Sequence, residues 1–166
     1  MSRIADEVHL MIRRPPRQQY AALCYRLRKK KQDGVEVLLL TSRDSGRWVI
    51  PKGWPMQGKK SHTVAEREAW EEAGVKGKAD RELYGHFRYA KGLDSGLKIP
   101  CRVQVHLLEV KDMAKVFPEK GSRRLEWVSC QEAAARVQEP ELKELILRLP
   151  EALQIGLSAR ENPVIS

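Results

Sequence analysis

Residues 53–75 read GWPMQGKKSHTVAEREAWEEAGV, and this stretch contains the most informative pattern in the chain. It places Glu68, Glu71 and Glu72 at positions i, i+3 and i+4, so a helix here would present three carboxylates on one face. Like charges at this spacing repel one another, and no helix gains stability from them alone. Carboxylate oxygens are the ligands that Mg²⁺ and Mn²⁺ prefer, so a bound cation would remove the repulsion. The pattern therefore predicts a metal site on a helix.

The flanking residues predict the limits of this helix. We expect it to begin near Ser61 or Thr63, with Thr63 and Glu66 forming a capping box. Gly74 is expected to end it as a C-terminal cap. The preceding residues, 51–60, are rich in Pro and Gly and predict a loop.

The rest of the chain predicts alternating strands and helices. Expected strands cover 20–27, 35–40, 48–50, 82–89, 102–110 and 124–128, the first two forming a hairpin. A short helix is expected at 131–137, and Leu142, Leu145, Ile146 and Leu149 mark a C-terminal amphipathic helix. Residues 91–100 are polar and Gly-rich, and we expect a mobile loop there. Mixed strands with helices on either side predict an α/β sandwich.

Composition is that of a soluble protein of one domain, with 166 residues, 42% hydrophobic and 32% charged. No apolar run approaches the 18 residues of a membrane span, and the N-terminus lacks the apolar core of a signal peptide. Cys24, Cys101 and Cys130 do not have metal-ligand spacing, so we expect reduced thiols and a cytoplasmic location.

Positive charge is concentrated at the start of the chain. The net charge is +9, and residues 1–31 hold nine Lys or Arg against only Asp6 and Glu7. A basic segment beside an acidic metal site suggests a polyanionic ligand. The simpler interpretation of Lys29, Lys30 and Lys31, which we favour, is a solvated hairpin tip.

The pattern in residues 53–75 resembles the signature of the Nudix hydrolases, Gly-x5-Glu-x7-Arg-Glu-U-x-Glu-Glu-x-Gly-U, where U is aliphatic. The residues in register are Gly53, Arg67, Glu68, Ala69, Glu71, Glu72, Gly74 and Val75. Lys59 departs from the pattern, because the family usually has Glu there. The resemblance implies an α/β/α sandwich with a mixed β-sheet. We place this domain at 17–150, between a basic extension at 1–16 and a tail at 151–166.

The resemblance and the chemistry together assign roles to the box residues. A divalent cation, Mg²⁺ or Mn²⁺, lowers the barrier to phosphoanhydride hydrolysis by neutralising phosphate oxygens and activating water. Glu68 and Glu72 are the expected direct ligands, with the Gly53 carbonyl completing the set. Glu71 belongs to the same metal site and is our candidate for orienting or deprotonating the water. Arg67 is expected to brace the carboxylates, with Glu66 as a substitute partner for it.

Residues outside the box resemble the subgroup that hydrolyses diphosphoinositol polyphosphates and diadenosine polyphosphates. The resembling stretches are 21–26, 37–52, and 124–127 running into 132–134. The resemblance implies phosphate binding by Arg17, Ser42 and Arg43. Lys52 would add a cation beside the site, and Trp54 would form an aromatic wall or simply fill a gap. Lys98 and Arg102 are expected to be either further phosphate contacts or solvated surface charges.

We therefore expect an enzyme that hydrolyses a diphosphate bond in a highly phosphorylated small molecule, a diphosphoinositol polyphosphate or a dinucleoside polyphosphate. Alternatives are a pyrophosphohydrolase acting on RNA 5′ ends or another nucleotide derivative, and a non-catalytic Nudix domain that binds such ligands. A basic nucleic-acid-binding protein is disfavoured, because aromatic residues total only 6% and no binding motif is present. No membrane partner is expected, and the sequence does not predict an oligomeric state.

Overall fold

The centre of the molecule is a mixed β-sheet. The computed structural model describes residues 15–28 and 34–154, and all bounds below refer to these residues. Seven strands form the sheet: β1 (Arg17–Leu27), β2 (Val35–Thr41), β3 (Trp48–Val49), β4 (Lys52–Gly53), β6 (Gly85–Gly92), β7 (Lys98–Glu109) and β9 (Leu125–Ser129). A separate two-stranded sheet joins β5 (Val75–Lys76) to β8 (Asp112–Met113).

Strand β1 organises the sheet because three strands pair with it. It runs antiparallel to β2 and to the short β4, and parallel to β7 from Arg17↔Cys101 to Tyr25↔Glu109. The β4 pairing, Tyr20↔Gly53 and Ala21↔Lys52, lies in a segment where the sequence predicted only loop. Two residues are too few to show a strand periodicity, but they fix Lys52 and Gly53 against the sheet.

Helix α2 (Ser61–Ala73) is the predicted carboxylate helix. Its Ala and Glu residues are strong helix formers. Gly74 caps its C-terminus in the left-handed region at φ 70°, as predicted. The predicted capping box is wrong, because Lys60 is the N-cap residue and makes no side-chain cap. Glu66 instead accepts a hydrogen bond from the backbone N–H of Ala79, 2.8 Å away.

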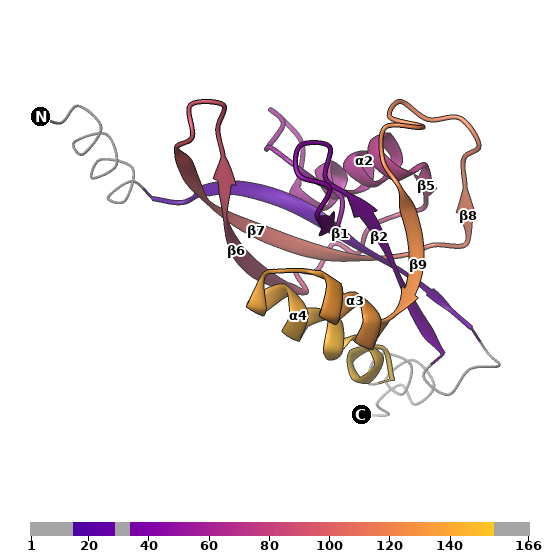
Figure 1. Ribbon diagram of the computed structural model, residues 1–166. Helices are drawn as coiled ribbons and strands as arrows, with labels where there is room; N and C mark the ends of the chain where they lie inside the picture. The colour runs from indigo at the N-terminus through magenta and orange to yellow at the C-terminus, as the bar shows by residue number, and fades with distance from the viewer. Residues whose placement is uncertain (1–14, 29–33, 155–166) are drawn as a thin grey trace, which may run out of the picture.

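Helices cover both faces of the sheet (Figure 1). Helix α2 packs on one face, and α3 (Cys130–Arg136) and α4 (Pro140–Leu147) pack on the other. Side chains of β1 alternate between the layers, so Leu23 joins the α3–α4 core while Cys24 joins the α2 core. The predicted α/β/α sandwich with a mixed sheet is confirmed.

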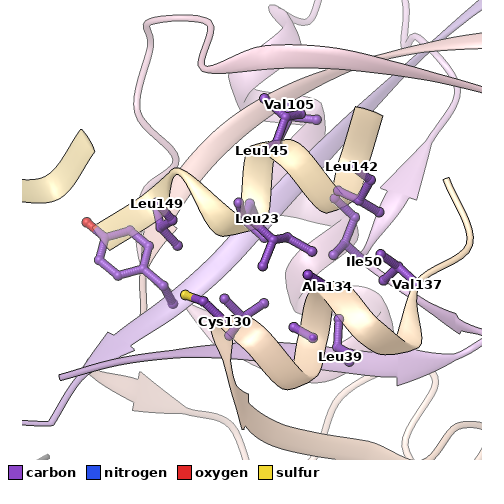
Figure 2. Close-up of a cluster of buried hydrophobic side chains, with 14 of the residues drawn as sticks. Leu23, Leu39, Ile50, Val105, Cys130, Ala134, Val137, Leu142, Leu145 and Leu149 are labelled. Atoms are coloured by element: carbon purple, nitrogen blue, oxygen red, sulfur yellow. The ribbon is translucent and has the colours of Figure 1, made fainter. Parts of the chain in front are cut away.

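The α3–α4 layer contains the larger aliphatic core. Figure 2 shows Leu142 and Leu145 of α4 converging with Ala134 of α3 on Leu23 and Leu39 of the sheet. All five are buried. This confirms the predicted apolar face of the C-terminal helix. The helical period of 3.6 residues places Leu142 and Leu145 on the side of α4 that faces the sheet.

The predicted mobile loop at 91–100 is mostly wrong. Strands β6 and β7 continue as a hairpin to the pair Gly92↔Lys98, leaving a turn closed by a 2.7 Å hydrogen bond from the Leu93 N–H to the Leu97 carbonyl. The polar composition of this segment suggested a loop. The exposed end of a hairpin is held by backbone hydrogen bonds, however, and does not need apolar side chains. Lys98 therefore lies on a strand and is exposed.

The predicted basic extension and tail lie largely outside the described residues, as does the Lys29–Lys31 run. Cys24, Cys101 and Cys130 are buried, and none of them forms a disulfide within the described residues. Within residues 15–28 and 34–154, no helix has the length and apolar character to cross a bilayer.

Candidate functional site

A cavity of about 260 Å³ lies where α2, β4, the β6–β7 hairpin and the segment before β9 meet. Its lining is strongly polar and brings acidic and basic side chains together. The lining residues are Gln19, Ser42, Arg43, Asp44, Val49, Lys52, Gly53, Trp54, Glu68, Glu72, Tyr89, Lys91, Glu119 and Arg123. Seven of the predicted site residues are among them: Ser42, Arg43, Lys52, Gly53, Trp54, Glu68 and Glu72.

Helical spacing and β4 pairing together place the two cavity carboxylates of α2. Glu68 and Glu72 are one turn apart, and Glu72 is buried against the sheet with a 5% exposed surface. The backbone N–H of Lys52 donates to Glu72 Oε2 at 3.0 Å, which ties the helix to β4. A Cβ at Gly53 would overlap the Glu68 carboxylate, so this position requires Gly for space rather than for its backbone angles.

Burial disfavours ionisation of these two carboxylates. It raises the pKa of Glu72 to about 8, against the opposing effect of the Arg123 guanidinium, and the neighbouring Glu68 raises it further. Burial also raises the pKa of Glu68, with Glu71 adding to the shift. A buried and a half-buried acid in this condition gain strongly from a divalent cation placed beside them.

Arg123 and Glu119 also line the cavity, and neither was predicted from the sequence. Arg123 Nη2 lies 3.0 Å from Glu72 Oε1 and 3.1 Å from Glu119 Oε1. Its Nη1 donates to the Thr41 carbonyl at 3.1 Å. The Arg123 side chain is only 11% exposed, so a buried guanidinium joins two acidic side chains from different segments.

Basic and aromatic side chains also line the cavity. Lys52 Nζ lies 5.0 Å from the centre of the Tyr89 ring, and burial lowers the pKa of this lysine. Lys91 Nζ lies 5.9 Å from the centre of the Trp54 ring. Arg43, mostly exposed, has its Nε 3.6 Å from Glu119 Oε1. These groups are suited to hold anionic oxygens in the same cavity as the carboxylates.

Three predicted site residues do not line the cavity. Glu71 bonds to Arg67, whose Nε is 2.8 Å from Glu71 Oε1 in an i,i+4 ion pair. Arg17, at the exposed start of β1, is also absent from the lining. The catalytic role of Glu71, the bracing role of Arg67 and the phosphate contact of Arg17 stay predictions. Glu66 is not the substitute partner of Arg67, because its carboxylate accepts from Ala79.

Lys59, which departs from the family pattern, lies at a second cavity. This one is about 360 Å³, on the outer side of α2, and Glu66, Arg67 and Trp70 also line it. It is the larger of the two cavities, but its lining contains neither Glu68 nor Glu72. The chemistry predicted from the sequence therefore belongs to the smaller cavity.

The donor chemistry of the smaller cavity fits a hard divalent cation. Glu68 and Glu72 supply carboxylate oxygens; Gly53 lines the same cavity, and its carbonyl stays a predicted ligand. In the described part of the chain, no three His, Cys, Asp or Glu side chains already converge as a ready-made metal centre. Glu71 is turned toward Arg67, so the third carboxylate of the predicted trio is directed elsewhere.

Several lining residues had no sequence signal that identified them. Tyr89 and Lys91 share one face of β6, and a correct hairpin would have placed them two residues apart on the same side. Glu119 and Arg123 come from an irregular segment between β8 and β9. Their i,i+4 spacing was visible, but nothing in the sequence placed that segment beside α2.

Comparisons with known proteins agree with this architecture. The family model described as NUDIX domain matches residues 17–149. Diphosphoinositol polyphosphate phosphohydrolase 3-beta of Bos taurus is 32% identical over 120 residues, which cover 71% of this chain and 67% of that protein. Nudix hydrolase 13, mitochondrial, of Arabidopsis thaliana is 30% identical over 107 residues, 61% of this chain and 53% of that protein.

Solved structures show the same fold. The crystal structure of the C. elegans Ap4A hydrolase superposes with a TM-score of 0.62 at 19% identity, covering 84% of this chain and 99% of that one. A Nudix hydrolase from Nitrosomonas europaea superposes with a TM-score of 0.59 at 19% identity, covering 83% and 90%.

Proposed function

This chain belongs to the Nudix family, and from that membership we propose that it hydrolyses a phosphoanhydride bond in a highly phosphorylated small molecule with the help of a divalent cation. Diphosphoinositol polyphosphates and dinucleoside polyphosphates are the candidate substrates. Relatives whose names include the first activity support this choice, as does the fold shared with an Ap4A hydrolase.

One observation carries the proposal. The two carboxylates of α2, Glu68 and Glu72, face the same cavity as Lys52, Lys91 and Arg43. Hydrolysis of a P–O–P linkage requires water to approach a phosphorus surrounded by negative oxygens. A site that combines acidic ligands with cationic side chains can bind a metal and a phosphate chain together.

The cation, when bound, supplies charge neutralisation of the phosphate oxygens and lowers the pKa of a bound water. Glu68 and Glu72 would hold it. Glu72 is kept in place by the Lys52 N–H, and Gly53 leaves room for the Glu68 carboxylate. Trp54, 39% exposed at the cavity rim, gives the substrate an apolar wall.

The cationic side chains that line the cavity indicate the substrate class. Lys52, Lys91 and Arg43 offer more cationic contacts than a single diphosphate needs, and clustered cations favour ligands with several phosphates. The basic segment at the start of the chain has the same sign of charge and would raise the local concentration of such ligands.

A turnover screen tests the proposal directly. The full chain is assayed with Mg²⁺ and with Mn²⁺ against inositol pyrophosphates, dinucleoside polyphosphates, triphosphorylated RNA and sugar nucleotides. We expect cation-dependent release of phosphate from the first two classes, abolished by EDTA. If triphosphorylated RNA is turned over faster than the other substrates, the protein would instead be an RNA 5′ pyrophosphohydrolase.

Arg43→Ala tests how the substrate is recognised. The side chain is exposed and lies beside Glu119, so its loss should leave the fold intact. We expect KM to rise about tenfold for a substrate with many phosphates and about twofold for a short diphosphate, because charge-assisted contacts are worth roughly 1–2 kcal/mol each. Equal effects on both substrates would make Arg43 a structural residue.

A non-catalytic ligand-binding role is the second candidate. The observation that favours it is the Arg67–Glu71 ion pair, which engages one of the three box carboxylates outside the cavity. Calorimetric binding of an inositol pyrophosphate, with no turnover under any cation in the screen, would establish this role.

A further inference from the structure

The buried guanidinium of Arg123 occupies an unusual position for an arginine. It lies between Glu72, the central carboxylate of the proposed metal site, and Glu119 from the segment before β9. The contact with Glu72, at 3.0 Å, is an ion pair, and the contact with Glu119, at 3.1 Å, is also a charge-assisted hydrogen bond. A hydrogen bond to the Thr41 carbonyl anchors the guanidinium to the end of β2.

These contacts place a fixed positive charge where a divalent cation would also find its ligands. Arg123 lines the cavity together with Glu68, Glu72 and Glu119. The two oxygens of Glu72 have separate partners, Arg123 at Oε1 and the Lys52 N–H at Oε2. A cation that binds Glu72 therefore meets a neighbouring guanidinium of the same sign, and both compete for the same carboxylates.

We propose that Arg123 is a built-in counter-cation of the acidic cluster: a positioning residue that holds Glu72 and Glu119 together without metal and weakens the binding of a divalent cation there. The inference rests on the proposed function, because it takes Glu72 to be a cation ligand. It assigns to Arg123 a role that depends on its charge and not only on its hydrogen bonds.

Two substitutions separate charge from hydrogen bonding. Arg123→Gln keeps an amide donor for the carboxylates and removes the charge, whereas Arg123→Lys keeps the charge on a single donor group. Arg136→Gln is the matched control, because Arg136 also joins two acidic side chains, Glu126 and Glu132, but does not line the cavity.

The first readout is the Kd for Mn²⁺ without substrate, measured on the full chain from the paramagnetic resonance signal of free Mn²⁺. We expect Arg123→Gln to bind Mn²⁺ about tenfold more tightly, because a like charge a few ångströms from the ion is removed. Arg123→Lys and Arg136→Gln should stay within about twofold of the wild type, because neither removes a charge beside the ion.

The second readout is Tm, in EDTA and in saturating Mn²⁺. Arg123→Gln should lower Tm by roughly 5 °C or more in EDTA, because the buried Glu72 and the half-buried Glu119 lose the guanidinium that joins them, and Mn²⁺ should restore most of the loss. Arg136→Gln should lower Tm equally in both conditions. If Arg123→Gln folds only with Mn²⁺, the inference is supported.

Other outcomes overturn the inference. Mn²⁺ affinity unchanged or weaker in Arg123→Gln, or a Tm loss that Mn²⁺ does not relieve, would make Arg123 an ordinary structural arginine. If Arg123→Gln folds in neither condition, Arg123→Lys decides. A tenfold change of its Mn²⁺ affinity would refute the proposed role of the charge, whereas an unchanged Mn²⁺ affinity would support that role. A wild type that does not bind Mn²⁺ refutes the proposed function, and the inference with it.

Discussion

The two faces of the sheet are packed by different rules. On the α3–α4 face, large aliphatic side chains such as Leu142 and Ile146 fill the core. On the α2 face, the helix contributes small alanines, and its buried surface includes the carboxylate of Glu72. The α3–α4 face therefore gains stability from apolar burial, while burial of the Glu72 carboxyl group on the α2 face is unfavourable.

This difference between the two faces matches the position of the proposed site, which lies on the α2 face. A helix with small residues lies close to the sheet, so its acidic side chains reach the cavity beside β4. The apolar burial on the Leu-rich face offsets the unfavourable burial of the Glu72 carboxyl group on the other face. We expect substitutions on the α2 face to reduce activity more than stability, and substitutions on the α3–α4 face to do the reverse.

Glu72→Gln should give the largest effect. Loss of a carboxylate ligand is expected to lower kcat by about a thousandfold, because metal coordination contributes several kcal/mol to the transition state. The fold should survive, since Gln can still accept from the Lys52 N–H. Steady-state kinetics and a thermal melt measure the two properties. Glu66→Gln on the same helix is the control and should keep wild-type kcat; a fully active Glu72→Gln would refute the site.

Leu142→Ala tests the opposite face. The side chain is 1% exposed in the α3–α4 core, so its truncation should lower the free energy of unfolding by about 3 kcal/mol. Urea denaturation measures this, and kcat of the folded fraction should not change. Leu147→Ala, on the same helix but 53% exposed, should cost little. A large loss of kcat in Leu142→Ala would mean that the two faces are coupled.

Gly53→Ala returns to the α2 face without changing any charge. The added methyl group would overlap the Glu68 carboxylate and displace it. We expect kcat/KM to fall about a hundredfold, the order expected when a catalytic group moves by about 1 Å. Gly92→Ala is the control, because nothing lies within 4 Å of a Cβ at that position. Full activity in Gly53→Ala would show that the exact position of Glu68 is unimportant.

The pH dependence of stability gives the smallest expected effect. The pKa of Glu72 is raised from 4.5 to about 8, so the folded protein holds this proton more tightly than the unfolded chain. The stability that the group contributes is fully present below about pH 4.5 and is lost as pH rises through about 8.

In EDTA, the free energy of unfolding of the wild type should therefore fall relative to Glu72→Gln by about 2 kcal/mol between pH 6 and pH 8. Chemical denaturation at several pH values measures this difference. Parallel curves for the two proteins would show that Glu72 is ionised throughout, and the contrast between the two faces would then be weaker.

The sequence predicted correctly those features that depend only on local backbone geometry. The period of a helix places Glu68 and Glu72 on one face whatever the surroundings, and the Leu142 to Leu149 pattern identified a buried helix for the same reason. Gly74 ends α2 because few other residues adopt its backbone conformation. These predictions did not depend on the tertiary fold.

Local patterns do not reveal contacts that the tertiary fold decides. Glu71 shares the helical spacing of Glu68, but in the structure its carboxylate is paired with Arg67, and its catalytic role stays a prediction. Arg123 reaches Glu72 from about fifty residues away, through a segment without periodic pattern, so no local principle could pair them. Glu66 accepts from Ala79 instead of capping α2, because a partner from outside the helix is available.

The parallel ladder between β1 and β7 also has a consequence for the order of folding. Gln18 and Arg102 are hydrogen-bonded across 84 residues of chain, and α2 lies in the intervening segment. Such distant pairings close slowly, since loop entropy is lost before contacts form. During synthesis, the helix with its acidic residues leaves the ribosome well before β7, the partner of β1. The nascent chain therefore passes through a stage in which these carboxylates exist without the pocket that they will line.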